Sequence, residues 1–170
     1  TREITLYGDL TDAEAEQLRA AGATSTVDGY VAKGDIDTTV RTATARGFVR
    51  CAPEVVAALR DGTAPKGDVL AVARIAGLQA AKRTPDLVPL AHPVAVHAVT
   101  VDLAVADDGV DITAQVRTAD RTGIEMEALT CVSVAALALI DMVKAVDKHA
   151  RITDVRVTAK SGGRSGDWHE

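Results

Sequence analysis

The amino-acid sequence predicts an α+β fold, in which helices pack on one face of an antiparallel β-sheet. Two stretches of alternating apolar and polar residues, 99–106 and 110–117, flank the turn signal Asp107-Asp108-Gly109. Alternation with period two gives a strand one buried face and one solvated face, so these stretches predict a β-hairpin. In two other stretches apolar residues recur with helical spacing, which predicts the covering helices.

The remaining elements complete this pattern. A short helix is expected after Pro53, because proline is favoured at the first helical position. Gly67-Asp68 is a suitable start for the next helix. In the last strand Val155, Val157 and Ala159 alternate with Arg156, Thr158 and Lys160. The elements expected outside the hairpin are a strand at 39–49, the helix after Pro53, helices at 66–82 and 125–146, and a strand at 155–160. This order is that of ferredoxin-like split βαβ folds.

Length and composition predict one well-filled core. The chain has 170 residues, of which 47% are hydrophobic and only 2% aromatic, so Ala, Val, Leu and Ile must build the core. Residues 1–30 are expected to form a small appendage with a strand near 4–7 and a helix near 12–21, and residues 31–170 the main domain. Small cores gain stability when subunits bury further surface, so an oligomer is expected.

The net charge of −5, with both signs mixed along the chain, argues against a nucleic-acid binder. A small anionic ligand held by a few converging cations remains compatible. Cys51 and Cys131 lack CxxC spacing and are expected to be core residues in a reducing cytoplasm. The longest apolar stretch, 131–140, is far shorter than the roughly 20 residues of a membrane span. No compact cluster of His, Asp and Glu predicts a metal site.

Two polar clusters precede predicted elements, where rigid scaffolds commonly hold functional groups. Lys66-Gly67-Asp68 opens a helix, whose backbone amides can receive an anion beside the lysine charge, although a solvated loop lysine would look the same. His92 lies in Pro89-Leu90-Ala91-His92-Pro93, a loop whose shape the prolines restrict. It can donate a hydrogen bond or move a proton there. An ordinary surface histidine is the alternative.

Two more clusters lie on the helix expected at 125–146. Glu125 and Glu127 occupy its first turn, where the helix dipole favours acidic residues, yet these carboxylates can also pair with the N–H edge of a guanine. Asp141 and Lys144 share a helix face. Their apolar neighbours suggest partial burial, which would shift both pKa values and make the two an acid–base pair. A structural ion pair is the alternative.

The last strand leads into the loop Lys160-Ser161-Gly162-Gly163-Arg164-Ser165-Gly166-Asp167. Glycines let backbone amides approach oxygen anions closely, and the two basic residues add charge. The lysine precedes the glycines and no helix follows, so this is not a Walker A loop. A disordered C-terminus is the alternative.

Three segments resemble the MoaC family in order and spacing: KGDVLAVARIAGLQAAKRTPDLVPLAHP, RTGIEMEALTCVSVAALALIDMVKAVDK and VTAKSGGRSGDW. The resemblance implies a ferredoxin-like subunit in a hexamer, a trimer of dimers with active sites at subunit boundaries. It also implies conversion of (8S)-3′,8-cyclo-7,8-dihydro-GTP into cyclic pyranopterin monophosphate and diphosphate in molybdenum cofactor biosynthesis. That reaction is a lyase-type cyclisation with no required cofactor, and Mg²⁺ accompanying the triphosphate stays open.

The family's motifs can be matched residue by residue. Asp141 resembles the catalytic aspartate, and Lys66 and Lys144 resemble the essential lysines. The substrate-binding residues that the resemblance implies are Leu90, Ala91, His92, Glu125, Met126, Glu127, Lys160 and Arg41. Ala91 replaces the family's usual Cys, which speaks against a thiol-dependent step there. Upstream of Thr39 the usual Val-Asp-Val-Ser segment is not cleanly present, so the role of residues 1–38 stays open.

Spacing separates two parts of this set. Glu127 and Asp141 are 14 residues apart, or roughly 21 Å along one continuous helix. One small pocket in a single subunit could hardly use both, so we expect sites that combine the glutamates of one chain with the Asp141–Lys144 pair of another. A nucleotide-binding module without turnover, and another nucleotide lyase or phosphohydrolase, are the alternatives. Diphosphate release and metal dependence would distinguish them.

Overall fold

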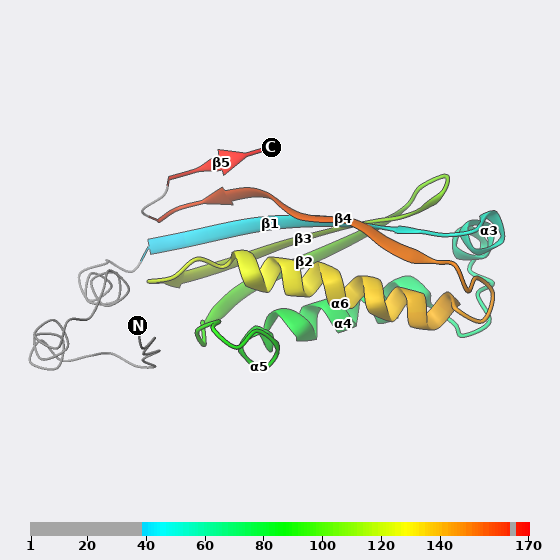
Figure 1. Cartoon of the computed structure of the whole chain (residues 1–170), viewed down its shortest axis with the longest axis horizontal. Coiled ribbons are helices and arrows are strands. Elements are labelled where there is room, and N and C mark those ends of the chain that lie inside the picture. Colours follow the sequence, from blue (N-terminus) through cyan, green and yellow to red (C-terminus); the bar gives the residue numbers. More distant parts are fainter. Residues whose placement is uncertain (1–38, 164–165) are drawn as a thin grey trace, which may run out of the picture. The chain divides into compact units, whose positions relative to one another are not determined.

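The computed structural model describes residues 39–163 and 166–170. Their elements, in chain order, are β1 (Thr39–Arg50), α3 (Pro53–Asp61), α4 (Val69–Ala81), α5 (Thr84–Leu87), β2 (Val96–Val105), β3 (Gly109–Asp120), α6 (Glu125–Val143), β4 (Arg151–Ser161) and β5 (Trp168–His169) (Figure 1). Each element expected between residues 39 and 160 is present. The strand and helix expected in the N-terminal appendage, and Arg164, lie outside the described residues.

The strands form one antiparallel sheet in the order β2-β3-β1-β4-β5. β1 lies inside the sheet, where it pairs with β3 along its whole length and with β4 on its other side. The predicted β2–β3 hairpin is confirmed. Because β3 lies between β1 and β2, the two strands of the first βαβ unit, the topology is the ferredoxin-like arrangement expected from the sequence.

Helices α4 and α6 pack against each other and cover one face of the sheet (Figure 1). Small residues allow this close packing. A Cβ added to Gly77 of α4 would lie 3.0 Å from the Cys131 carbonyl oxygen on α6. Cys51 and Cys131 are buried and free, and burial raises the pKa of their thiols to about 11 and about 12. Both are therefore core residues, as predicted.

The two long helices are shorter than their apolar patterns predicted. α4 begins at Val69, because the Asp68 side chain accepts a hydrogen bond from the Ala71 N–H at 2.9 Å and caps the helix. Lys66 therefore lies in the preceding turn and not in the helix. α6 ends at Val143, ahead of the expected end at residue 146.

Strand β4 departs from the strict alternation that its sequence suggested. Its register on β1 shifts at Thr158, which is the extra residue of a β-bulge. Beyond the bulge Lys160 pairs with the buried Ala43 and shares its side of the sheet. The bulge therefore turns the Lys160 side chain toward the helices and interrupts the alternation expected through residue 160.

The helix contact at Gly77 gives a test of the fold. Replacing Gly77 by Val is expected to lower the free energy of unfolding by about 1 to 3 kcal/mol, because the new side chain must push α4 away from the Cys131 backbone. Gln79→Val introduces the same residue at an exposed position of α4, and it is expected to cost only about 0.5 kcal/mol. Urea denaturation followed by circular dichroism measures both. Equal losses in the two variants would contradict the close approach of the helices.

Candidate functional site

The residues predicted to act together fall into two groups at the two ends of α6 (Figure 1). We name the first the lysine group, which consists of Lys66, Asp141 and Lys144. We name the second the glutamate group, which consists of Arg41, Leu90, Ala91, His92, Glu125, Met126, Glu127 and Lys160. From Glu125 to Asp141 the helix rises roughly 24 Å. One chain therefore keeps the two groups apart.

In the lysine group, the carboxylate of Asp141 lies between two ammonium groups. Lys144 Nζ, one helical turn further on, lies 2.7 Å from Asp141 Oδ1. Lys66 Nζ donates a hydrogen bond to the Asp141 backbone carbonyl oxygen at 2.8 Å and lies 3.4 Å from Oδ2. The helix dipole favours cations at this end of α6. Each oxygen of the carboxylate thus has its own cation.

The partial burial expected for Asp141 and Lys144 was wrong. Their side chains are 59% and 60% exposed, because they lie on the outer side of the last helical turn, whereas Val143 points into the core. Hydrogen bonds from Lys144 and then Lys66 hold the pKa of Asp141 below its ordinary value. Asp141 is therefore ionised at neutral pH.

In the glutamate group, Lys160 Nζ donates to Glu125 Oε1 at 2.9 Å, and both side chains are largely buried. Arg41 is also buried, and its Nε donates to the Asp120 carbonyl oxygen at 2.9 Å. Burial opposes the charge of Glu125. The hydrogen bond from Lys160, together with the charges of Lys160 and Arg41, outweighs it, so the pKa of Glu125 lies below its ordinary value. These two cations would meet an anion where water screens them little.

Glu127 is the most buried carboxyl of the glutamate group, with 3% exposure. Burial first, and then the charge of Glu125, raise the pKa of Glu127, although a backbone hydrogen bond opposes them. A carboxyl group with a raised pKa is better able to hold a proton near neutral pH. Met126 lies between the two glutamates in sequence and is exposed.

The loop that carries His92 lies at the same end of the sheet. The buried Thr118 hydroxyl donates to the Ala95 carbonyl oxygen at 2.7 Å, which ties the loop to the end of β3. The same strand end accepts the hydrogen bond from Arg41. Leu90 is exposed, whereas Ala91 and His92 are half-buried.

The glycine loop after β4 packs on Arg41. Gly163 has a φ of 87°, and a Cβ added there would collide with the Arg41 guanidinium. Asp167 Oδ1 accepts the Gly162 N–H at 2.7 Å and so closes the loop. The sequence suggested that these glycines allow an anion to approach the backbone. In the described residues, Gly163 instead allows the Arg41 guanidinium to approach it.

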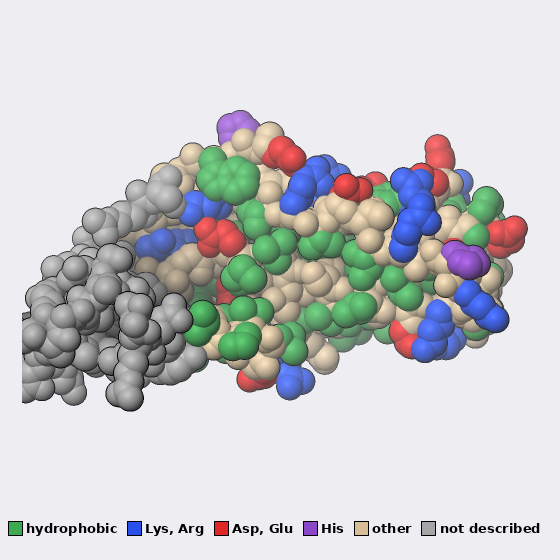
Figure 2. Space-filling view, in the orientation of Figure 1, with side chains coloured by type: hydrophobic (Ala, Val, Ile, Leu, Met, Phe, Trp, Pro, Cys, Tyr) green, Lys and Arg blue, Asp and Glu red, His purple; other side chains and the backbone are tan. Residues whose placement is uncertain are grey.

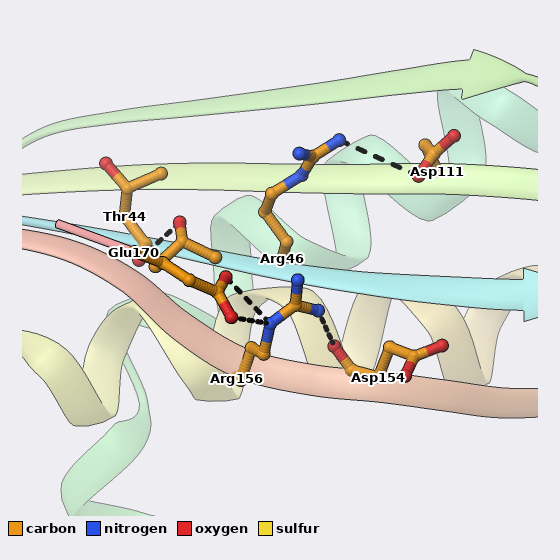
Figure 3. Close-up of polar contacts among 7 residues, drawn as sticks. Thr44, Arg46, Asp111, Asp154, Arg156 and Glu170 are labelled. Carbon is orange, nitrogen blue, oxygen red and sulfur yellow. Dashed lines mark hydrogen bonds and ion pairs between the residues drawn. The ribbon is translucent and has the colours of Figure 1, made fainter.

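The sheet face opposite the helices carries a hollow of about 450 Å³. Charged side chains line it in ion pairs (Figure 3), with Arg156 Nε 2.9 Å from Glu170 Oε2 and Arg46 Nη2 3.8 Å from Asp111 Oδ1. Such exposed pairs contribute about 1 kcal/mol or less. None of the predicted site residues lines this hollow.

Among the described residues, no three His, Cys, Asp or Glu side chains are grouped so that they could hold a metal ion. α6 is long and apolar enough to cross a membrane by length and composition alone. However, 50% of that stretch is buried inside the fold, as in the core helix of a soluble protein.

Sequence reasoning missed residues that hold the site in place. Thr118 falls on the buried side of β3, where a polar residue in an apolar row was the available signal. Asp147 is buried and accepts hydrogen bonds from two backbone N–H groups. Its signal was an acidic residue just after a helix C-terminus, which the dipole disfavours.

Comparisons with known proteins show the family of the chain. The model of the MoaC family matches residues 31–163. A protein of Streptomyces coelicolor named cyclic pyranopterin monophosphate synthase is 67% identical over 132 residues, 78% of each chain. Cyclic pyranopterin monophosphate synthase 2 of Mycobacterium tuberculosis is 58% identical over 77% of this chain and 78% of its own. The cyclic pyranopterin monophosphate synthase of Corynebacterium efficiens is 52% identical over 91% of this chain and 97% of its own.

The contact between Lys160 and Glu125 gives a prediction about titration. Replacing Lys160 by Met is expected to raise the pKa of Glu125, because burial remains while the hydrogen bond and the charge are lost. In the parent protein the contact stabilises the fold above the unfolded-state pKa of Glu125, and this is lost as the pH falls through the lowered folded value. Carbon-13 NMR titration of the carboxyl group measures the shift. Arg156→Met, on the opposite sheet face, should leave Glu125 unchanged; an unchanged Glu125 in Lys160→Met would refute the assignment.

Proposed function

The chain belongs to the MoaC family, and we propose that it converts (8S)-3′,8-cyclo-7,8-dihydro-GTP into cyclic pyranopterin monophosphate and diphosphate. It is an enzyme of molybdenum cofactor biosynthesis. We assign the reaction to the lyases and the protein to the cytoplasm. The proposal requires no resident cofactor, and Mg²⁺ bound to the triphosphate would be compatible with it.

The observation that carries the proposal is the ionised Asp141 between Lys66 and Lys144. Closing the cyclic phosphate requires a sugar hydroxyl to attack the α-phosphorus while diphosphate leaves. The hydroxyl proton must pass to a base, and the leaving diphosphate must be stabilised by cations. A carboxylate flanked by two ammonium groups offers both functions within one small group.

The glutamate group supplies what the lysine group lacks. Arg41 and Lys160 are buried cations suited to phosphate oxygens. Building the pterin ring needs ring opening, reclosure and several proton transfers, which we assign to Asp141 and Lys144. Glu127 and His92 would orient the purine-derived ring of the substrate, whose N–H groups Glu127 would bind. This division explains why carboxyl groups and cations are both needed around one substrate.

We further propose that each site is shared between two chains of a homo-oligomer, a hexamer built as a trimer of dimers. A two-fold axis near the middle of α6 would set the helix antiparallel to its copy, so that each lysine group faces a partner's glutamate group. The outer side of the helix layer suits such a contact. Apolar side chains are spread along the face shown in Figure 2, and exposed ones on the two helices include Val72, Ile75 and Leu137.

The role of Asp141 is tested by Asp141→Asn. This variant is expected to lower kcat by about 100-fold or more, because the amide cannot take the proton, while the fold stays intact. Asp102→Asn, an exposed aspartate on β2, is the matched control and should keep full activity. Release of diphosphate and formation of the pterin product are measured with the purified chain and the cyclic GTP derivative. Normal turnover of Asp141→Asn would refute the assignment.

Sharing of the sites is tested by subunit mixing. Asp141→Asn and Glu127→Gln chains should each be inactive alone. When they are unfolded together and refolded, half-and-half dimers contain one intact site and one doubly altered site, so about a quarter of the parent activity is expected. Mixing without unfolding is the control. No recovery in refolded hybrids, confirmed by mass spectrometry, would rule out shared sites.

A further inference from the structure

Asp147 is a buried charge that the proposed reaction does not use. Among the described residues, the buried charged side chains are Arg41, Glu127 and Asp147. The first two belong to the glutamate group. Asp147 lies at the other end of α6, just beyond Lys144, with 8% exposure. Burying a carboxylate is costly unless hydrogen bonds satisfy it, so its partners define its role.

The carboxylate of Asp147 joins two segments that are far apart in sequence. Its Oδ2 accepts the Ala52 N–H at 2.8 Å, and its Oδ1 accepts the His149 N–H at 2.8 Å. Ala52 is the N-cap of α3 and provides no side-chain cap of its own. The chain after α6 is also folded back, because the Asp147 N–H donates to the Val143 carbonyl oxygen at 3.0 Å. Asp147 therefore links the end of α6 to the start of α3.

The same two segments meet a second time in the lysine group. α3 ends at Asp61 with Gly62 as its C-cap, and the turn that follows carries Lys66. Lys66 reaches back to Asp141 in the last turn of α6. One contact is buried and joins the Ala52 backbone N–H to the Asp147 carboxylate. The other, Lys66 to Asp141, is exposed and depends on a flexible side chain. The buried contact is therefore the more rigid of the two.

We propose that Asp147 is a positioning residue, which holds the turn of Lys66 and the last turn of α6 at the separation that puts both lysines on Asp141. The importance of Asp147 for catalysis rests on the proposed function. Its effect on the positions of the two lysines does not. Asp147 is suited to this role because a carboxylate can accept both N–H groups at once. An amide can accept only one of them without placing its own N–H₂ group against a donor.

The charges around Asp147 keep it ionised. Hydrogen bonds from Ala52 and then His149 lower the pKa of Asp147. His149 is the titratable group that adds a favourable charge, and Cys51 faces the carboxylate as a neutral thiol with a pKa of about 11. The contact is therefore present above the ordinary pKa of an aspartate and is lost as the pH falls through the lowered value.

The test measures the pKa of Asp141 in Asp147→Asn by carbon-13 NMR, with the signal identified through Asp141→Asn. The pKa should rise, because Lys66 and Lys144 no longer hold their places, and kcat should fall about 10- to 100-fold with a much smaller change in KM. Thr84→Val is the control: it removes another buried hydrogen bond, from Thr84 Oγ1 to the Ala81 carbonyl oxygen. It should lower Tm without changing the titration of Asp141. If Asp141 titrates as in the parent protein, the proposal is overturned.

Ala52→Pro provides a second variant should Asp147→Asn fail to fold. Ala52 has a φ of −64°, which proline adopts, so the change removes the donor N–H and little else. It should raise the pKa of Asp141 in the same direction. The double variant with both Asp147→Asn and Ala52→Pro should shift the pKa of Asp141 by no more than the larger of the two single shifts. Additive shifts would contradict a hydrogen bond shared by the two residues. A parent protein without turnover, but with these shifts, would refute the proposed function and support the positioning role.

Discussion

The continuity of α6 is the constraint on which the rest of the molecule depends. Its N-terminal turn carries the glutamates and its C-terminal turn carries Asp141 and Lys144, with roughly 24 Å between them. No rearrangement of loops can shorten a helix that is packed against α4 and the sheet. If the two groups act on one substrate, as proposed, they must meet across copies of the chain, and the exposure of the lysine group in the single chain is compatible with such an arrangement.

Small residues keep that helix in place. The core contains few large side chains, so its cohesion comes from close approach of backbones, as at Gly77 against Cys131. A helix seated this closely has little freedom to slide, and the positions of its two ends are fixed to the same degree. Polar contacts at the two ends add to this placement: Thr118 holds the His92 loop, and Asp147 holds the start of α3.

The sequence predicted the strands, the covering helices and their order, because these follow from periodicity. It could not predict the bulge at Thr158, since alternation gives no sign of one extra residue, and so it gave no indication that Lys160 faces the helices. It also misjudged the burial of Asp141. Apolar neighbours in sequence lie on the other side of a helix as often as on the same side, and only the packing of α6 shows which side faces outward. The spacing of Glu127 and Asp141, in contrast, was read correctly, because it depends on helix geometry alone.

Charge explains why neither group suffices alone. The lysine group has two cations and one carboxylate, and the glutamate group has two cations and two carboxyl groups. A triphosphate needs a clear excess of positive charge, which the glutamate group lacks while both of its carboxyl groups are ionised. Joined to a partner's lysine group, such a site would have four cations against three carboxyl groups. Burial raises the pKa of Glu127, whereas hydrogen bonds from lysines lower those of Glu125 and Asp141, so Glu127 would lose its charge first as the pH falls.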